Sequence, residues 1–597
     1  MFRRESNQRN ESSTCSLNKS QNCLFVMETI STFEVLPDEM ILLICRYLRC
    51  GEILYSLFNL NSRLNSTITD FCHHVNLMRI TYKQFDFVTT KVFPHIGLSI
   101  KSFVFNGGWE NVLMNEEHST SFQLKLSLMF PQLHTLVLMN FINNQLDAFL
   151  NKIRDLIELV KLDIRNFRGE HTEELLKKVL ATNNNRLKSV SFDYDSIYFN
   201  LTSSDNDETV SYPNIEELTV NLTTDKTFEY LFALVPCINR LHINFDQLLS
   251  ASKSTLSHIC SLVHLKDFYL RSISERWSFD EIAYILSKMP SLRRLALDLC
   301  TDDTNLVNGQ NFISILPSSV IEIHLFMIYY FESKHELDTL HSTWPTHIRI
   351  AFLLNEPNNY GVIHTIPCDL PSMVIPAIIA NSMMAGFEYT RKVTYLRICG
   401  KQSSTDIRMI LQHFHRLRKL TLSSKNDLQS FTPQSTQPVV LHLPHLKSLY
   451  VPATCEIVHL LRAAPNLEHL RIDIDCLNIV LDDASTCELL QKRIVSLEVN
   501  HVREIDSIQL DKIAREFNHL LDLGVSLKDP PINIEVLILQ ILSLWKDKNL
   551  RCFYVGGSLT DEVSKNLRQW IVEYSHLEQD DLFDVEYASN SVVIWLS

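Results

Sequence analysis

Glycine is the residue that this sequence most clearly lacks. Only 12 of the 597 residues are glycine, about 2% where roughly 7% is usual. Loops that cradle phosphate groups and folds that bind dinucleotides depend on clustered glycines, and the sequence has no GxGxxG, no GKS or GKT and no GxSxG. We therefore expect neither a nucleotide-dependent enzyme nor a GxSxG hydrolase.

Three further absences narrow the class of protein. No run of 18 apolar residues suggests a membrane span. The 14 cysteines include no CxxC pair, and the N-terminus has no recognisable signal peptide, so we expect reduced thiols and a chain in the cytoplasm, the nucleus or both. An excess of positive charge is also missing, since the net charge is -14, which argues against nucleic-acid binding.

Local signatures of catalysis or metal binding are missing as well. None of the 23 histidines lies in an HExxH motif or a Cys/His finger spacing, and no short motif marks a Ser or Cys nucleophile. His413, His415, His442 and His445 are therefore expected to be structural or surface residues. We predict no catalytic residue, no metal and no cofactor.

What the chain does contain is a repeated pattern of apolar residues. With 45% hydrophobic and 21% charged residues it is expected to bury a large core. One six-residue pattern recurs sixteen times. It consists of an apolar residue, two variable residues, a second apolar residue, one variable residue and a third apolar residue. The copies begin at Ile100, Leu133, Leu159, Leu187, Ile215, Ile238, Leu265, Leu292, Val320, Val393, Leu417, Leu446, Leu467, Ile494, Leu520 and Leu550.

The spacing of these copies, mostly 26 to 29 residues, is the period of a leucine-rich repeat. Each copy predicts a short strand whose last two apolar residues point inward and whose variable residues face out. Amphipathic patterns between the copies, for example from Leu146, Phe279, Glu456 and Ile534, predict helices. We therefore expect an α/β solenoid shaped as a curved horseshoe, with one concave sheet of sixteen strands roughly 70 Å long.

Two parts of the array are expected to be irregular. Residues 326–390 contain five prolines and no clean copy, so they predict degenerate repeats around His347, an insertion over the concave face that contributes a selective contact, or a divergent repeat that bends the solenoid. At the C-terminal end, residues 560–597 predict a last helix and a last strand that cap the array.

The stretch from Phe33 to Ile68 predicts three short helices. Pro37 suits a first helical turn, and Asp38 and Glu39 place negative charge at the positive end of the helix dipole. One stripe consists of Ile41, Ile44, Cys45 and Leu48, and four further apolar residues, Met40, Leu42, Leu43 and Tyr47, fall outside it. A helix that is apolar nearly all round needs cover on two faces, and a module of about 40 residues is too small to provide both. One face is then expected to bind a partner, unless the stretch is an ordinary part of a single core.

This stretch resembles an F-box. The resemblance rests on Leu36-Pro37-x-Glu39, Ile44, Tyr47-Leu48, a turn at Cys50-Gly51, Leu54, Leu57 and Asn61-x-Arg63. It departs from the family at Gly51-Glu52, where an acidic residue usually leads the second helix. The resemblance implies binding to the Skp-type adaptor of a cullin-RING ubiquitin ligase. The residues predicted to contact the adaptor are Leu36, Pro37, Glu39, Ile44, Tyr47, Leu48 and Leu57, some of which could instead belong to the core of the module.

The predicted domains are a disordered tail (1–28), an F-box (29–78) and a repeat domain (79–597), with translation starting at Met1 or at Met27. Outward-facing residues on the strands of the second half predict a mixed aromatic and basic patch for a protein target. Its members are Tyr395, Arg397, Lys419, Tyr450, His469 and Arg471. The simpler alternative is that these are merely varied solvent-facing positions.

Together these features predict a substrate-recognition subunit of a Skp-cullin-F-box ubiquitin ligase. The F-box would bind the adaptor and the repeats an unknown protein target, and the chain itself would catalyse nothing. The main alternative is a leucine-rich-repeat scaffold or inhibitor that acts without a ligase. An enzyme of the hydrolase or nucleotide-dependent kind is disfavoured by the missing glycine motifs.

Overall fold

The computed structural model describes most of the chain from Leu36 to Leu596. The described residues are 36–78, 80–107, 126–141, 143–167, 173–194, 196–200, 210–223, 227–245, 259–331, 339–355, 359–383, 392–400, 404–423, 441–451, 457–502, 507–517, 519–527, 534–579, 583–588 and 590–596. The predicted tail and Met27 lie outside them. The chain divides into two compact units, one ending at Arg49 (unit 1) and one beginning at Cys50 (unit 2).

In unit 1 the described residues form one helix, α1 (Asp38–Cys45). Pro37 precedes it with an extended ψ of 151°, and its carbonyl accepts hydrogen bonds from the backbone N–H groups of Met40 and Ile41. Asp38 and Glu39 occupy the first turn, as expected, where their charges favour the positive end of the helix dipole. The predicted boundary between domains at residues 78 and 79 stays a prediction.

Unit 2 is a mixed α/β structure with two sheets of mainly parallel strands. The strand order of the first sheet is β1-β2-β3-β4-β5-β6-β7-β8-β9-β10-β12-β11, so neighbours in the sheet are neighbours in the chain except at its end. Its strands are β1 (His74–Asn76), β2 (Ser102–Asn106), β3 (Thr135–Met139), β4 (Lys161–Arg165), β5 (Ser189–Phe192), β6 (Glu217–Asn221), β7 (Arg240–Asn244), β8 (Asp267–Arg276), β9 (Arg294–Thr301), β10 (Glu322–Tyr330), β11 (Ile350–Asn355) and β12 (Tyr360–Thr365).

The second sheet has the order β13-β14-β15-β16-β17-β18-β19-β20-β22-β21. Its strands are β13 (Ser372–Pro376), β14 (Tyr395–Cys399), β15 (Lys419–Ser423), β16 (Ser448–Val451), β17 (His469–Asp473), β18 (Ser496–Val502), β19 (Asp522–Leu527), β20 (Cys552–Gly556), β21 (Asp584–Ala588) and β22 (Ser591–Trp595). All sixteen copies of the repeat thus contain a strand. Their repeated apolar residues are buried, for example Leu159, Leu162 and Ile164 of the copy in β4.

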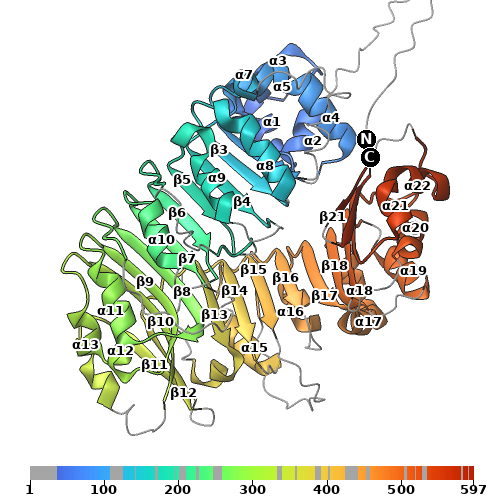
Figure 1. The fold of residues 1–597 in the computed structure, drawn as a ribbon. Coiled ribbons are helices and arrows are strands. Elements are labelled where there is room, and N and C mark those ends of the chain that lie inside the picture. The colour runs from blue at the N-terminus through green and yellow to red at the C-terminus, as the bar shows by residue number, and fades with distance from the viewer. Residues whose placement is uncertain are drawn as a thin grey trace, which may run out of the picture. The chain divides into compact units, whose positions relative to one another are not determined.

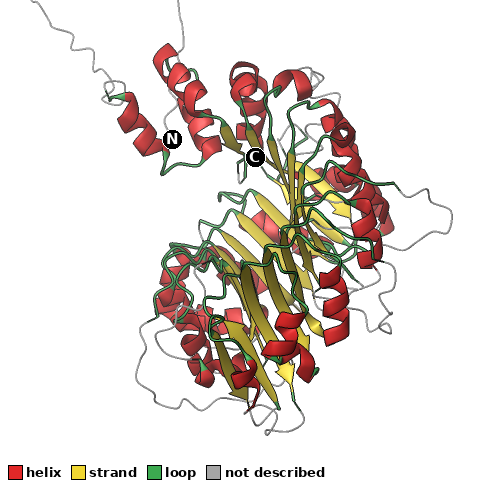
Figure 2. Cartoon of the chain, turned by 90° about the vertical axis from the view of Figure 1, so that its left-hand side faces the viewer, coloured by secondary structure: helices red, strands yellow, loops and turns green. Residues whose placement is uncertain are grey.

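Helices connect most of the strands and lie on the outer side of both sheets, while the strands line the inner side (Figures 1 and 2). The α-helices are α2 (Cys50–Leu57), α3 (Ser62–Phe71), α4 (Tyr82–Phe87), α5 (Phe93–Ile96), α7 (Leu126–Met129), α8 (Asn143–Lys152), α9 (Glu173–Asn185), α10 (Thr227–Leu234), α11 (Phe279–Ser287), α12 (Thr304–Val307), α13 (Gly309–Ser314), α15 (Ser404–Leu411), α16 (Ile457–Ala463), α17 (Ile474–Asp482), α18 (Ala484–Gln491), α19 (Ser507–Glu516), α20 (Glu535–Leu544), α21 (Asp561–Lys565) and α22 (Leu567–Tyr574). Short 3₁₀ or π turns are η1 (Val88–Val92), η2 (Gly97–Ser99), η4 (Ile153–Asp155), η5 (His341–Thr343) and η7 (Ala377–Ser382).

The expectation of one continuous sheet was wrong. After β10 the chain makes an antiparallel hairpin, β11–β12, in which β12 pairs with β10 and ends the parallel run. The next strand, β13, pairs in parallel with β14 and starts the second sheet. β13 belongs to a seventeenth copy of the pattern, Leu370-x-x-Met373-x-Ile375, which was not among the sixteen predicted copies.

The expectation that the variable residues of every strand face solvent was also wrong for β8 to β10. The chain just before and within β13 lies against the inner side of these strands, where Tyr269 Oη and Ser372 Oγ are 3.5 Å apart and Arg294 donates to the carbonyl of Asp369 at 3.2 Å. Tyr269 is consequently buried. Within residues 326–390, the segment at β13 thus contains a copy of the repeat and also covers part of the inner face, two features that were predicted as alternatives.

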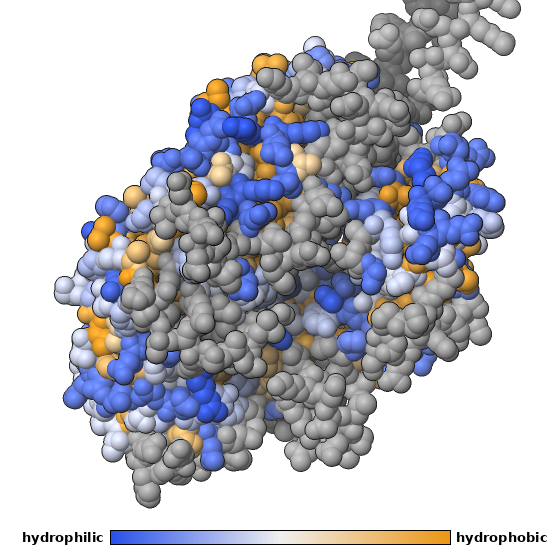
Figure 3. Space-filling model, in the orientation of Figure 1, coloured by the Kyte–Doolittle hydropathy of each residue, from blue (hydrophilic) through white to orange (hydrophobic). Residues whose placement is uncertain are grey.

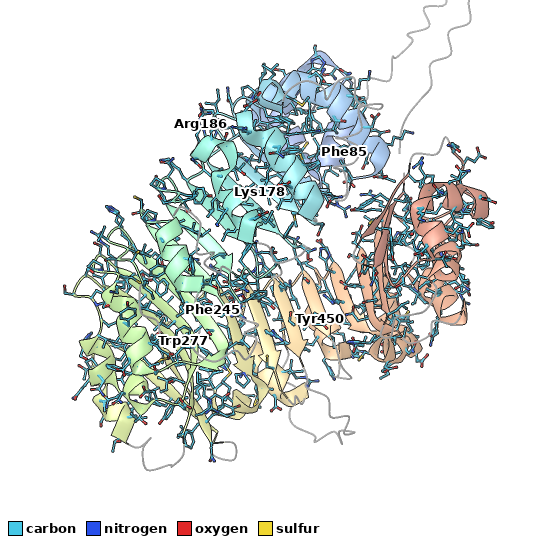
Figure 4. All side chains as sticks on the ribbon, in the orientation of Figure 1. Phe85, Lys178, Arg186, Phe245, Trp277 and Tyr450 are labelled. Atoms are coloured by element: carbon cyan, nitrogen blue, oxygen red, sulfur yellow. The ribbon has the colours of Figure 1, made fainter. Side chains whose placement is uncertain are left out.

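Aromatic side chains fill the interior between the first sheet and its helices. The rings of Phe105 and Phe149 stack with centroids 5.3 Å apart, and those of Phe93 and Phe130 meet edge to face at 5.1 Å. Further along the sheet Phe245 lies beside Trp277, with 6.2 Å between ring centroids (Figure 4). These contacts fix the strands of the sheet, and the side chains on its inner face project from the opposite side.

Candidate functional site

One face of α1 and the turn after it exposes a row of large apolar side chains. Met40, Leu43, Ile44, Tyr47 and Leu48 are 45%, 47%, 37%, 91% and 44% exposed, and we call them the α1 apolar face. Their spacing of i, i+3, i+4, i+7 and i+8 places them on one side of a helix. The chain continues the helical curl beyond Cys45, because the N–H groups of Tyr47 and Leu48 bond to the carbonyls of Ile44 and Cys45.

The predicted stripe of Ile41, Ile44, Cys45 and Leu48 is buried in part and exposed in part. Ile41 is buried and Cys45 half-buried, whereas Ile44 and Leu48 belong to the exposed α1 apolar face. Met40 and Leu43, which were not among the predicted contact residues, complete that face. The sequence already contained the signal for this face, because Met40, Leu43, Ile44 and Tyr47 are apolar residues at i, i+3, i+4 and i+7.

The other residues predicted to contact an adaptor are placed as follows. Leu36 is half-buried, and Pro37 and Glu39 are exposed. Leu57 lies in α2 of unit 2 and is only 9% exposed, so it packs in the interior there. Asn61 has a local structural role, because its side chain caps α3 by accepting a hydrogen bond of 2.8 Å from the N–H of Leu64.

A second candidate surface is the inner side of the second sheet. Register places the predicted target-binding residues in two rows across neighbouring strands. Tyr395, Lys419, Ser448 and His469 form one row, and Arg397, Thr421, Tyr450 and Arg471 form the other. The register thus sets these residues side by side, and Figure 4 marks Tyr450 on this sheet; their role in binding a target stays a prediction.

Within this surface the cations are partly engaged. Lys419 Nζ lies 5.3 Å from the ring centre of Tyr395, and the guanidinium of Arg471 lies 4.7 Å from that of Tyr450. Arg471 also pairs with Glu498 of β18 at 3.2 Å, so the neighbouring repeat adds an acidic group to the patch. Partial burial raises the pKa of the Tyr450 phenol, and Arg471 opposes that rise.

The inner side of the first sheet carries charges of alternating sign at one register position. Glu217, Arg240, Asp267, Arg294 and Glu322 follow one another on β6 to β10. Adjacent members are separated by 2.9 to 3.5 Å, from Arg240–Glu217 at 2.9 Å to Arg294–Glu322 at 3.5 Å. Although burial opposes ionisation of Asp267, His242 and the two arginines hold the pKa of its carboxyl below the usual value. Because three carboxylates alternate with two arginines, this row does not extend the basic patch.

Comparison with known proteins adds no identification. No model of a known protein family matches the chain, and no curated protein matches it. Among the described residues, no helix combines the length and the apolar character that crossing a bilayer requires.

The two candidate surfaces differ in kind. The α1 apolar face consists of unpaired hydrophobic surface, which is costly to expose to water and is typical of a protein interface. On the face of unit 2 seen in Figure 3, apolar residues form small separate spots among hydrophilic ones. Hydrophobic association is therefore best supported at α1, and polar recognition at the inner side of the second sheet.

Proposed function

We propose that this protein is the substrate-recognition subunit of a Skp-cullin-F-box ubiquitin ligase. In this proposal residues 29–78 are an F-box that binds the Skp-type adaptor and through it a cullin. The repeats form a leucine-rich-repeat domain that binds a protein target. The chain catalyses no step itself, and its contribution to ubiquitin transfer is to bring the target close and orient it.

The observation that carries the proposal is the α1 apolar face. It presents Ile44, Tyr47 and Leu48, three of the residues that the F-box resemblance assigns to the adaptor. Their burial against a partner would remove from water side chains worth about 1.5 to 3 kcal/mol each. A face of this kind has no evident use in a scaffold that acts alone.

The repeats support the second half of the proposal. Parallel strands in chain order, each with buried apolar residues at the repeat positions, agree with a leucine-rich-repeat array. The inner side of the second sheet offers Tyr and Arg side chains, which are frequent anchors in protein interfaces. Tyr395, Arg397, Lys419, Tyr450, His469 and Arg471 remain our candidates for target contact.

The proposal is tested by binding of the full chain to a purified Skp-type adaptor. We compare it with Ile44→Ser/Leu48→Ser, in which both changes fall on exposed side chains and should leave the fold intact. If both residues are interfacial, affinity should fall by roughly two or more decades. The matched control is Ile321→Ser/Ile479→Ser, which alters two exposed isoleucines, 83% and 56% exposed, in unit 2.

Binding by the intact chain and by the control, but not by the α1 variant, supports the ligase proposal. Circular dichroism of all three proteins shows first that they are folded. An intact chain that does not bind the adaptor contradicts the proposal and favours the repeat scaffold or inhibitor. Equal binding by all three contradicts the assignment of the α1 apolar face.

A further inference from the structure

Three polar residues gather where β17 ends and β18 bends, on the inner side of the second sheet. Asp473 is the last residue of β17, and its register partner on β18 is Asn500. Alternate residues of a strand share a face, so both lie on the side that carries Arg471 and Glu498. His501 follows Asn500, and its Nδ1 is 3.0 Å from Oδ2 of Asp473.

Asn500 is buried with its hydrogen-bonding capacity unused. Its side chain is 4% exposed, and neither Oδ1 nor Nδ2 has a hydrogen-bond partner among the described residues. Oδ1 of Asp473 is buried and equally without a partner in that part of the chain. Leaving a buried amide without hydrogen-bond partners is energetically costly, which is why native proteins nearly always satisfy such groups.

Asparagines at the same repeat position in the first sheet behave differently. Asn221 and Asn244, like Asn500, are the seventh residue of their copies. Nδ2 of Asn221 donates to the carbonyl of Asp193 at 2.8 Å, and Nδ2 of Asn244 donates to Oδ1 of Asn221 at 3.2 Å. In these two copies the amide nitrogen of the asparagine donates to the preceding repeat, whereas Nδ2 of Asn500 has no such partner among the described residues.

The backbone beside Asn500 is also exceptional. The register between β18 and β19 shifts between Val499 and Val502, and His501 has a φ of 54°, in the left-handed region. A bulge of this kind redirects side chains. The His501 side chain is 55% exposed and that of Asp473 14%, so the cluster reaches solvent through the histidine.

The free oxygens of the cluster favour a hard metal cation as the ligand. Two oxygens, Oδ1 of Asp473 and Oδ1 of Asn500, have lone pairs to give, and the carboxylate supplies negative charge. Arg471, on the same face of β17, is engaged by Glu498 at 3.2 Å. A calcium ion is held by carboxylate and amide carbonyl oxygens at about 2.3–2.6 Å, which matches the two oxygen types present here.

We propose that Asp473, Asn500 and His501 form a binding site for a calcium-type divalent cation. The oxygens of Asp473 and Asn500 are its ligands, water completes the coordination, and His501 orients the carboxylate through its hydrogen bond. The described residues hold no group of three His, Cys, Asp or Glu side chains that would suit a metal, so the amide of Asn500 is the decisive addition. With so few protein ligands, the expected Kd is about 10⁻⁴ to 10⁻³ M.

Calorimetric titration of the full chain with calcium chloride tests this site. We expect one equivalent to bind and the thermal midpoint to rise with calcium concentration, because the ion binds only the folded state. Asp473→Asn and Asn500→Leu should each weaken binding at least about tenfold. Asp547→Asn, which removes the same charge from an exposed position, is the matched control and should bind as the unchanged chain does.

Stability in chelator adds a second readout. Leucine resembles asparagine in size but leaves no polar atom unpaired, so Asn500→Leu should have the higher thermal midpoint without calcium and the lower one with it. No binding by the unchanged chain at about ten times the expected Kd overturns the site. The site is also overturned if Asp547→Asn loses as much affinity as Asp473→Asn, or if Asn500→Leu is the more stable protein at every calcium concentration. This proposal does not depend on the ligase proposal.

Discussion

The side chains of Arg271 and Asp298 form an ion pair inside unit 2, at positions that the repeat pattern assigns to the inner face. Both side chains have no exposed surface, and Nε of the arginine is 3.5 Å from Oδ2 of the aspartate. The guanidinium also lies 5.1 Å from the ring centre of Tyr194. Because the segment around β13 covers this part of the inner face, two residues that would elsewhere be solvated charges are held in the interior.

Removing one charge of this pair should be far more damaging than removing both. We expect Arg271→Met to lower the free energy of unfolding by about 3 to 5 kcal/mol, because Asp298 is left buried and uncompensated. Arg271→Met/Asp298→Leu should recover most of that loss. Urea unfolding followed by circular dichroism measures the differences.

The control is Arg276→Met, which breaks the Arg276–Asp302 pair at 2.8 Å, where both side chains are more than half exposed. That variant should change stability by no more than about 1 kcal/mol. If the double variant at Arg271 and Asp298 is as unstable as the single one, the pair is not what compensates these charges.

At the scale of elements, α2 packs closely against Ile80, which lies two residues before α4. A Cβ on Gly51 would lie 2.1 Å from Cγ2 of Ile80, far inside contact distance. Helix propensity alone predicts that Gly51→Ala stabilises α2 by about 1 kcal/mol. The clash should outweigh this gain, because a β-branched isoleucine buried at 1% exposure has little freedom to move.

We therefore expect Gly51→Ala to destabilise unit 2 by about 1 to 3 kcal/mol, the usual cost of overpacking. Ile80→Leu removes the methyl group that clashes, so Gly51→Ala/Ile80→Leu should be more stable than the two single changes predict together. Denaturant unfolding of the four proteins gives this coupling. A stabilising Gly51→Ala, or strict additivity, would show that α2 is not held against Ile80.

The elements that the sequence predicted are those whose periodicity is undisturbed. A copy such as the one from Leu159 places three apolar residues at fixed spacing, and burial against neighbouring copies makes it a strand. β13 was missed because Met373 stands in for a leucine and because Pro371 lies within the copy and Pro376 directly after it. β11, β12 and β21 pair antiparallel, and the repeat period contains no information about them. β1 has three residues, too few for a periodic signal.

The candidate site was only partly predictable for a related reason. The pattern from Met40 to Leu48 indicated two apolar faces on α1, but which residues each face takes depends on packing, and it is Ile41 that is buried. Leu57 had the same apolar character, yet it lies in the interior. Rows of inner-face residues followed directly from the repeat register, whereas the pairing of Arg471 with Glu498 required the order of the strands.

At the scale of the whole molecule, the two sheets of unit 2 share one hydrophobic interior. Its buried residues include Phe326 and Val362 from the first sheet and Met373 and Leu396 from the second. His364 of β12 lies at this junction, 1% exposed, with its ring stacked on Phe326 at 6.4 Å between centroids. Loss of packing at this point should therefore affect both sheets together.

Acid should weaken this junction. Burial lowers the pKa of His364 from 6.5 to about 4. Between these two values the unfolded chain binds the proton and the folded chain does not, so the stabilising contribution is complete above pH 6.5 and is lost as the pH falls towards 4. The difference between the two pKa values corresponds to on the order of 3 kcal/mol.

We expect His364→Gln to lose less stability than the unchanged chain between pH 7 and pH 4, by roughly that amount. Urea unfolding at the two pH values measures it. His415→Gln, at an exposed histidine near β15, is the control and should follow the unchanged chain. An identical pH dependence in the chain with His364→Gln would contradict a buried, neutral imidazole at the junction.

The edges of the two sheets determine how readily copies of this chain could pair with one another at high concentration. An open edge of a sheet can template a strand from another copy and so start a fibre. Here β1 is only three residues long, Pro376 interrupts the donors of β13, and β21 carries Asp584 and Glu586, the latter bonded to Gln145 at 3.0 Å. The apolar strand β11 is covered by η7. Among the described residues, the edges of both sheets are thus poorly suited to pair with a strand of another copy.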